Sequence, residues 1–345
     1  MRILTKAEAV PKNLNQPVSK ARLAWLDILK GMGIILVAIG HIYQNDVVYD
    51  WIYSFHMPLF FLAAGWVYKV TPVVEHIKKR FFTVIVPYFS FGLLVLLYWQ
   101  LLERRFRDSD MTFAEALIGL LRGQYDYLDF NVHLWFLPCF FVTVVLYNIL
   151  VNIHKKKWLA YGVCFLMSAV FVLVEMPELP WGLNRVFQYI GFYALGDILG
   201  SAKADSVLSG AHKAVWFAAE MALLALNFGL AYFDLTKGIM WFVTGTVGVA
   251  SCILFSVRIR KCAPLEYLGR ISLTVLCIHG PVYRVLVKIV SVPLNMSTDE
   301  VRANAALALV VTAVTLAICS LAYEIIIRIL PWMVGAKKSV KKTAA

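Results

Sequence analysis

The sequence predicts an all-α fold, a polytopic transmembrane helical bundle of about ten spans with both termini in the cytoplasm. Of the 345 residues, 61% are hydrophobic and only 16% are charged, whereas soluble domains are about half apolar and about a quarter charged. The mean hydropathy of +0.73 is too high for a soluble chain of this length, because the surface of a soluble domain must face water. The composition therefore excludes soluble, disordered and fibrous proteins.

The apolar residues come in continuous runs that are long enough to cross a bilayer, which takes about 20 residues of helix. These runs do not alternate with polar residues at a period of two, and this excludes a transmembrane β-barrel. The longest loop, residues 103–131, contains an apolar stretch that we expect to form a re-entrant or an amphipathic outer helix. The predicted spans are residues 23–43, 51–69, 81–102, 132–153, 158–175, 184–200, 214–233, 238–257, 267–291 and 304–330.

The positions of lysine and arginine set the predicted orientation. Most of the 33 basic residues fall in alternate connecting segments, which places these segments and both termini in the cytoplasm. We expect a cytoplasmic tail over residues 1–21, a membrane domain over 22–331 and a basic cytoplasmic tail over 332–345. The net charge of +12 then reflects membrane topology, and it gives no reason to expect a nucleic-acid partner.

Cysteine and histidine spacing gives no sign of a metal site. The six cysteines contain no C-x-x-C pair, so neither a disulfide framework nor a zinc–cysteine site is expected. The histidines show no i, i+4 pair and no H-x-x-E spacing, which are the local patterns of metal ligands. The sequence therefore predicts no bound metal.

Ionisable groups inside the spans are the first candidates for function, because they are costly to place in a bilayer. The first span carries Asp27, Lys30 and His41. Eleven residues separate Lys30 from His41, which brings both side chains to nearly the same helix face, and Asp27 lies one turn from Lys30. We expect this stripe to face a polar cavity. The alternatives are a lysine that snorkels to the surface beside Asp27 and a histidine at the outer interface.

Further histidines fall at depths compatible with His41. His56 and His133 lie near the outer ends of the second and fourth predicted spans, and His279 lies deep within the ninth. Each of His56 and His133 alone is equally compatible with an interfacial or structural role. Their expected convergence with His41 favours a functional site. Arg284 and Lys288 also fall inside the ninth predicted span.

A basic run, HIKKRFF, precedes the third predicted span on the cytoplasmic side. Its Lys78, Lys79 and Arg80 are candidates for binding a phosphate-bearing donor, because lysine and arginine make charge-assisted hydrogen bonds to phosphates. The alternative is ordinary anchoring of a cytoplasmic loop by positive charge.

Five segments of the chain carry a resemblance to a known family. In order they are LDILKGMGIILVAIGH, SFHMPLFFLAAGW, KKRFFTVIVPYFSF, HLWFLPCFF and LEYLGRISLTVLCIHGP. Together they resemble the acyltransferase-3 family of bacterial membrane O-acyltransferases, including enzymes similar to fucose 4-O-acetylases. The resemblance extends from about residue 22 to residue 330, and the element from Lys30 to His41 matches the family signature.

The resemblance implies transfer of an acyl group, usually acetyl from cytoplasmic acetyl-CoA, to a hydroxyl of a cell-envelope glycan or lipid-linked sugar. It also implies a bacterial cytoplasmic membrane protein. Some relatives carry an additional extracytoplasmic domain. We expect none in this chain, so it is expected to act alone or with a separate extracytoplasmic partner.

Acyl transfer to an alcohol needs a base and a group that stabilises the oxyanion. His41 is the first candidate for the base, or for a nucleophile that carries the acyl group. Lys30, positioned by Asp27, is expected to neutralise charge on the donor or intermediate. Lys78, Lys79 and Arg80 are expected to hold CoA phosphates, and His56, His133 and His279 to bind the acceptor.

Two other classes of function fit parts of the sequence. A transporter of a small polar solute or amino acid would also bury charged residues along a pathway, but no inverted repeat is evident. A structural scaffold in the membrane lipid explains none of the buried charges.

Overall fold

A computed structural model describes residues 23–107, 110–154, 156–204 and 213–336. These residues form helices and no β-strand, which confirms the predicted all-α class. The predicted tail over residues 1–21 lies outside the described residues, as does the C-terminal tail from residue 337. The long helices are α1 (Ala24–Ile42), α2 (Asp46–Trp66), α4 (Val86–Leu101), α6 (Phe136–Ile153), α7 (Lys157–Leu173), α8 (Leu183–Ser201), α10 (Lys213–Tyr232), α11 (Gly238–Ile259), α12 (Ala263–Leu294) and α14 (Ala305–Ile329).

Shorter elements connect these helices. Helix α3 (Val73–Arg80) continues into α4 through a π-helical turn, η1 (Phe81–Ile85). Between α4 and α6 lie α5 (Phe113–Arg122) and the 3-10 segments η2 (Glu103–Arg105), η3 (Tyr125–Tyr127) and η4 (Asp129–Trp135). A further 3-10 turn, η5 (Pro180–Gly182), precedes α8, and α13 (Thr298–Ala303) joins α12 to α14, which is followed by η6 (Pro331–Val334). The apolar stretch expected in the long loop is therefore helical, as α5.

Each predicted span overlaps one of the long helices. Eight helical stretches in the described residues are long and apolar enough to cross a membrane. Helices α7 and α8 are not among them, and α7 has only 17 residues. The structure thus supports a membrane bundle, while the count of about ten spans and the cytoplasmic position of the termini stay predictions.

Helix α1 lies at the centre of the bundle and packs closely on α12. A Cβ atom added to Gly31 would lie 2.1 Å from the carbonyl oxygen of Leu265, and one added to Gly269 would lie 1.9 Å from that of Asp27. Small residues allow such backbone contact between membrane helices. The two glycines therefore set the position of α1 along the axis of α12. This in turn sets the position of the side chains farther along each helix.

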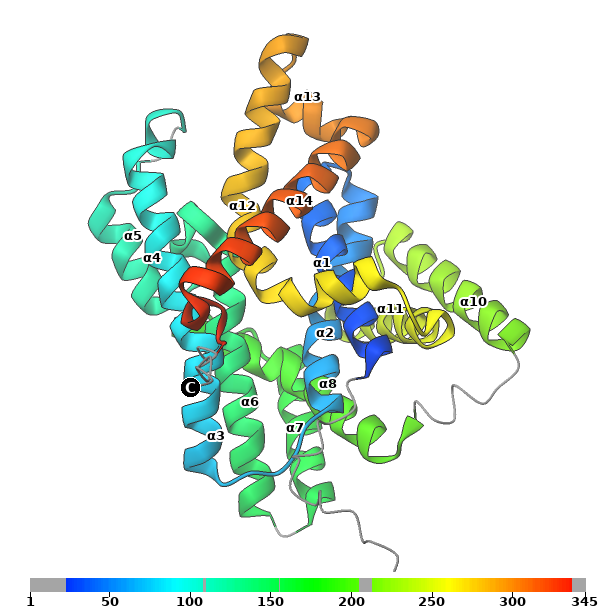
Figure 1. Ribbon diagram of the computed structural model, residues 1–345. Coiled ribbons are helices and arrows are strands. Elements are labelled where there is room, and N and C mark those ends of the chain that lie inside the picture. Colours follow the sequence, from blue (N-terminus) through cyan, green and yellow to red (C-terminus); the bar gives the residue numbers. More distant parts are fainter. Residues whose placement is uncertain (1–22, 108–109, 155, 205–212, 337–345) are drawn as a thin grey trace, which may run out of the picture.

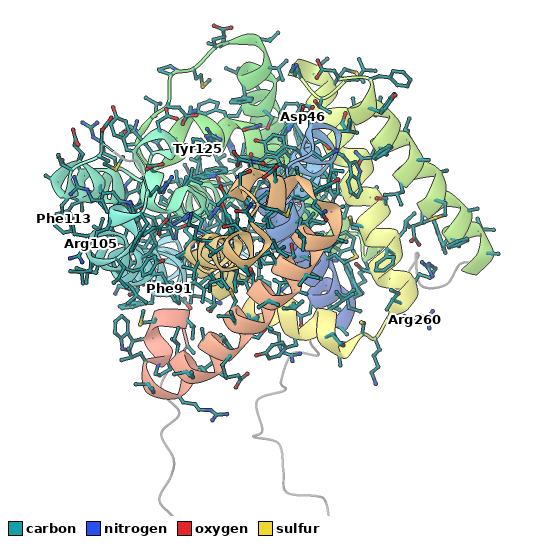
Figure 2. All side chains as sticks on the ribbon, turned by 90° about the horizontal axis from the view of Figure 1, so that it is seen from above. Asp46, Phe91, Arg105, Phe113, Tyr125 and Arg260 are labelled. Atoms are coloured by element: carbon teal, nitrogen blue, oxygen red, sulfur yellow. The ribbon has the colours of Figure 1, made fainter. Side chains whose placement is uncertain are left out.

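The two ends of the molecule differ in what they contain. Figure 1 shows α13 and the second half of α12 at the upper end, and the start of α3, the end of α6 and the start of α7 at the lower end. From above, Phe113 and Arg105 lie at one edge of the molecule and Arg260 at the opposite edge, with α12 and α13 between them (Figure 2). The C-terminus of α1, the N-terminus of α2 and η4 also lie toward the upper end, and with them the candidates His41 and His133.

Candidate functional site

A cavity of about 1860 Å³ opens at the upper end of the molecule. The end of α1, the start of α2, the end of α4, the segment containing η3 and η4, the second half of α12 and α13 surround it. Its wall is rich in aromatic, imidazole and charged side chains: His41, Tyr43, Asp46, Tyr49, Tyr53, Tyr98, Glu103, Arg107, Tyr125, Asp126, Asp129, His133, Tyr283, Arg284, Lys288 and Arg302. An aromatic wall with a few placed polar groups is typical of a small-molecule site.

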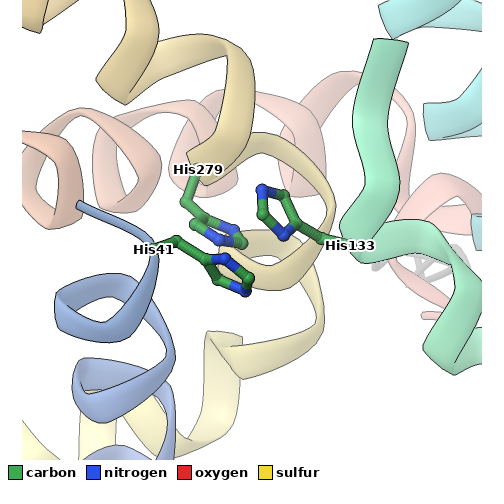
Figure 3. A group of neighbouring side chains, drawn as sticks. All are labelled: His41, His133 and His279. Atoms are coloured by element: carbon green, nitrogen blue, oxygen red, sulfur yellow. The ribbon is translucent and has the colours of Figure 1, made fainter. Parts of the chain in front are cut away.

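Three imidazoles meet beside this cavity (Figure 3): His41 and His133 line its wall, and His279 is fully buried. His41 comes from the last turn of α1, His133 from η4 and His279 from the middle of α12. The ring centroids of His41 and His133 are 4.0 Å apart, those of His133 and His279 are 4.1 Å apart, and those of His41 and His279 are 5.5 Å apart. The structure thus brings together three of the histidines that the sequence singled out.

The hydrogen bonds of these imidazoles leave several ring nitrogens open. The Nδ1 of His279 lies 2.9 Å from the carbonyl oxygen of Val275; a carbonyl only accepts, so Nδ1 carries the hydrogen and Nε2 holds a lone pair. That Nε2 atom, and both ring nitrogens of His133, are buried without a partner among the described residues. The hydroxyl of Tyr53 lies 2.8 Å from Nδ1 of His41 and 3.3 Å from its Nε2.

The IHGP sequence of α12 explains how His133 reaches its place. A Cβ atom on Gly280 would lie 2.7 Å from Cδ2 of His133, so only a glycine leaves room for the ring. Pro281 has no N–H, which leaves the carbonyl of Cys277, four residues earlier, without its helical partner. The side-chain amide of Asn131 donates to that carbonyl at 2.8 Å. The proline therefore creates the acceptor that attaches η4 to α12.

Two arginines complete the attachment of η4. Arg284 donates to a carboxylate oxygen of Glu103 at 3.1 Å and to the carbonyl oxygen of Phe130 at 2.8 Å. Arg107 donates to the carbonyl and to the carboxylate of Asp129 at 2.9 Å and 2.7 Å. No role for these residues was predicted from the sequence. A signal for Arg284 was present, as an arginine inside a predicted span, whereas Arg107 carries no local signal.

Asp27 and Lys30 form an ion pair with an N–O distance of 2.8 Å, but neither lines the cavity. They lie in the first half of α1, whereas His41 lies in its last turn. The Asp27 side chain is buried and that of Lys30 is 28% exposed. The pair is therefore separate from the imidazole cluster.

His56 and the basic run also lie outside the cavity wall. The His56 ring is buried, and its Nδ1 lies 2.8 Å from the carbonyl oxygen of Ile52. Because a carbonyl only accepts, Nδ1 is the donor in this hydrogen bond. Its ring centroid is 4.7 Å from that of Tyr53, which separates it from the cavity. Lys78, Lys79 and Arg80 form the last turn of α3.

A second buried polar cluster, on α6, α7 and α8, was not identified from the sequence. Asp197 of α8 is 2% exposed and accepts from the hydroxyls of Tyr147 at 2.6 Å and Tyr161 at 3.1 Å. It also forms an ion pair with Lys157 at 3.0 Å and accepts from Ser201 at 3.1 Å. An aspartate within a predicted span was the available signal.

Comparison with known proteins identifies the family. No curated protein and no solved structure matches the chain. A family model described as an acyltransferase domain matches residues 23–324, which contain the three clustered histidines and nearly all of the described helices. The match confirms the resemblance noted in the sequence, and the chain belongs to the acyltransferase-3 family of membrane O-acyltransferases.

Proposed function

We propose that the enzyme transfers an acyl group, most simply acetyl, from cytoplasmic acyl-CoA to a hydroxyl of a cell-envelope glycan or lipid-linked sugar. The observation that carries this proposal is the group of open imidazole nitrogens at the wall of a tyrosine-rich cavity. An acyltransferase needs a base at the place where the acceptor hydroxyl binds, and flat aromatic walls with polar edges suit a sugar.

His41 is the proposed base, because it lines the cavity and has a hydroxyl to orient its ring. When Nδ1 donates to Tyr53, Nε2 holds the lone pair that takes the proton from the acceptor hydroxyl. The acceptor oxygen then bonds to the acyl carbonyl carbon, the C–S bond breaks, and the CoA sulfur leaves with its electron pair and takes up the proton. The alternative is that His41 nitrogen first bonds to the acyl carbon and passes the group to the hydroxyl.

The remaining predicted residues take supporting roles in this proposal. His133 and His279 contact the acceptor beside His41, and His56 supports the site from behind Tyr53. Lys30, held by Asp27, neutralises charge on the donor or intermediate. Lys78, Lys79 and Arg80 bind the CoA phosphates from the cytoplasm.

The proposed setting is the bacterial cytoplasmic membrane, with both termini in the cytoplasm. The donor approaches from the cytoplasm and the acceptor from the cavity end, where a separate extracytoplasmic partner is able to deliver or receive it. The transporter alternative is not favoured, because the chain belongs to a family of acyltransferases.

The test is transfer by the purified protein in nanodiscs, supplied with radiolabelled acetyl-CoA and a panel of envelope glycans. His41→Ala removes the proposed base, and we expect the rate of labelled product formation to fall by about 10²–10⁴-fold. His154→Ala is the matched control, since His154 lies beyond the end of α6 and outside the cavity, and its rate should equal that of the parent. A folded His41→Ala variant with an unchanged rate would reject His41 as base and as acyl carrier.

A further inference from the structure

We propose that His41, His133 and His279 form a binding site for a zinc ion, and that zinc bound there competes with acyl transfer. The site itself rests on the geometry of the cluster, and only the competition rests on the proposed function. The sequence predicted no metal, because the spacing of histidines along the chain reveals only ligands that belong to one local segment. The three ligands instead come from α1, η4 and α12, and only the fold brings them together.

The distances suit a single ion after a small closure. One ring nitrogen from each histidine lies within 4.8 Å of the others. Three nitrogens on one tetrahedral zinc lie about 3.4 Å apart, because each Zn–N bond is about 2.0–2.1 Å. His133 is the ring that is able to close this gap, since neither of its nitrogens has a partner among the described residues and its rotation breaks no hydrogen bond.

Two of the three imidazoles already have the outer contacts that metal-binding histidines use. Such a histidine donates its second ring N–H to a carbonyl or another oxygen, which fixes the tautomer and the ring direction. His279 donates from Nδ1 to the carbonyls of Val275 and Leu276, at 2.9 Å and 3.0 Å. His41 has the Tyr53 hydroxyl 2.8 Å from its Nδ1. The Nε2 atom of His279 is thereby left open for an ion, and that of His41 is left open when the Tyr53 hydroxyl, which lies 3.3 Å from it, bonds to the nearer Nδ1.

The groups around the cluster are compatible with the positive charge of the ion and with a fourth ligand. Arg284 is paired with Glu103, and Arg302, which donates to the backbone carbonyls of His41 and Ile42, lies 3.9 Å from the carboxylate of Asp299. Both nearby cations are thus held by other groups. His41 and His133 line the cavity, so a water molecule from the cavity supplies the open fourth position that a three-histidine zinc site keeps.

Zinc at this position occupies the lone pairs that the proposed base needs. The His41 nitrogen that takes the hydroxyl proton is the nitrogen that would bind the ion, and one lone pair serves one partner at a time. Bound zinc therefore inhibits transfer, and a chelator that removes the ion restores it.

The test measures binding directly. Protein with a histidine-free affinity tag is stripped with EDTA in nanodiscs and titrated with Zn²⁺ by calorimetry, then with Co²⁺, whose visible absorption reports tetrahedral nitrogen ligation. We expect one ion per chain, bound by the parent and by His154→Ala. His133→Ala and His279→Ala should bind at least tenfold more weakly. His133→Gln, which fills the space of the ring, replaces His133→Ala if that variant does not fold.

Each outcome bears on one part of the proposal. Equal binding by the parent and both cluster variants, or no binding by the parent, would overturn the zinc site. Zinc binding without loss of transfer would overturn the competition. Absence of transfer under every condition would count against the proposed function alone, because the titration reads the zinc site without any acyl donor.

Discussion

The imidazole cluster and the Asp197 cluster are both buried and polar, yet they differ in how completely their atoms are hydrogen-bonded. The Asp197 carboxylate accepts from Tyr147, Tyr161, Lys157 and Ser201. In contrast, several ring nitrogens around His133 have no partner in the described part of the chain. Buried polar groups are normally paired, since an unpaired one costs about 1–3 kcal/mol.

The difference separates a stabilising network from one that we propose to be reactive. The satisfied carboxylate has no lone pair left for a ligand, so its value lies in holding α6, α7 and α8 together. The open nitrogens reduce stability, and a fold retains such groups where they serve a site. Substitutions in the two clusters should therefore act on different quantities, with rate changes from one and stability changes from the other.

After His41→Ala, the largest expected effect comes from Gly280→Ala. The new methyl group would lie 2.7 Å from Cδ2 of His133, which forces that ring out of the cluster. Displacing a group that positions the acceptor by about 1 Å costs about 10²-fold in rate, and we expect a loss of that size in the nanodisc transfer assay. Gly162→Ala is the matched control, because a Cβ atom there meets nothing within 4 Å. Equal rates for the two variants would contradict the role of Gly280.

The contact of Gly280 with His133 could not be predicted from the sequence. Continuous apolar runs predicted the helices, and the depth of His41, His133 and His279 within them predicted that they share a level of the membrane. Their contact depends on the closeness of α1 to α12 at Gly31 and Gly269. It also depends on η4, which is not a regular helix.

The η4 segment had no recognisable pattern because its backbone is set by distant partners. Asn131 has an extended backbone (φ −161°, ψ 77°) inside the 3-10 segment, and its side chain bonds to a carbonyl 146 residues away in sequence. Arg284 bonds to Phe130, 154 residues away. Local propensity does not encode contacts of that range. For the same reason, neither the partners of Asp197 nor the position of Lys30 outside the cavity wall could be predicted from the sequence.

The next effect is expected in the other cluster. Asp197→Asn keeps the shape of the side chain but removes its charge and turns one acceptor atom into a donor, which faces hydroxyl and ammonium donors. We expect a loss of about 1–3 kcal/mol in the free energy of unfolding, seen as a lower Tm in the same nanodiscs. The transfer rate per folded molecule should stay at the parent value. A fall in rate with an unchanged Tm would place Asp197 in the reaction instead.

The smallest effects are expected from variants that each remove one hydroxyl, one from each cluster. Tyr53→Phe removes the oxygen that orients His41, and Tyr161→Phe removes one of the donors to Asp197. Since a hydrogen bond contributes about 1 kcal/mol, and about 1.4 kcal/mol corresponds to tenfold in rate, each effect should be modest. We expect Tyr53→Phe to lower the transfer rate several-fold with little change in Tm. Tyr161→Phe should lower Tm and leave the rate unchanged.

The two tyrosine variants are matched in chemistry, because each loses the same atom and keeps the same ring. Any general effect of deleting a tyrosine hydroxyl therefore appears equally in both. If both variants changed rate and Tm in parallel, the division between an open, reactive cluster and a satisfied, stabilising one would be wrong. If Tyr53→Phe changes only the rate and Tyr161→Phe changes only Tm, the two kinds of buried group are distinguished by their hydrogen bonds. A group with open positions is available to a substrate, and a fully hydrogen-bonded group holds helices together.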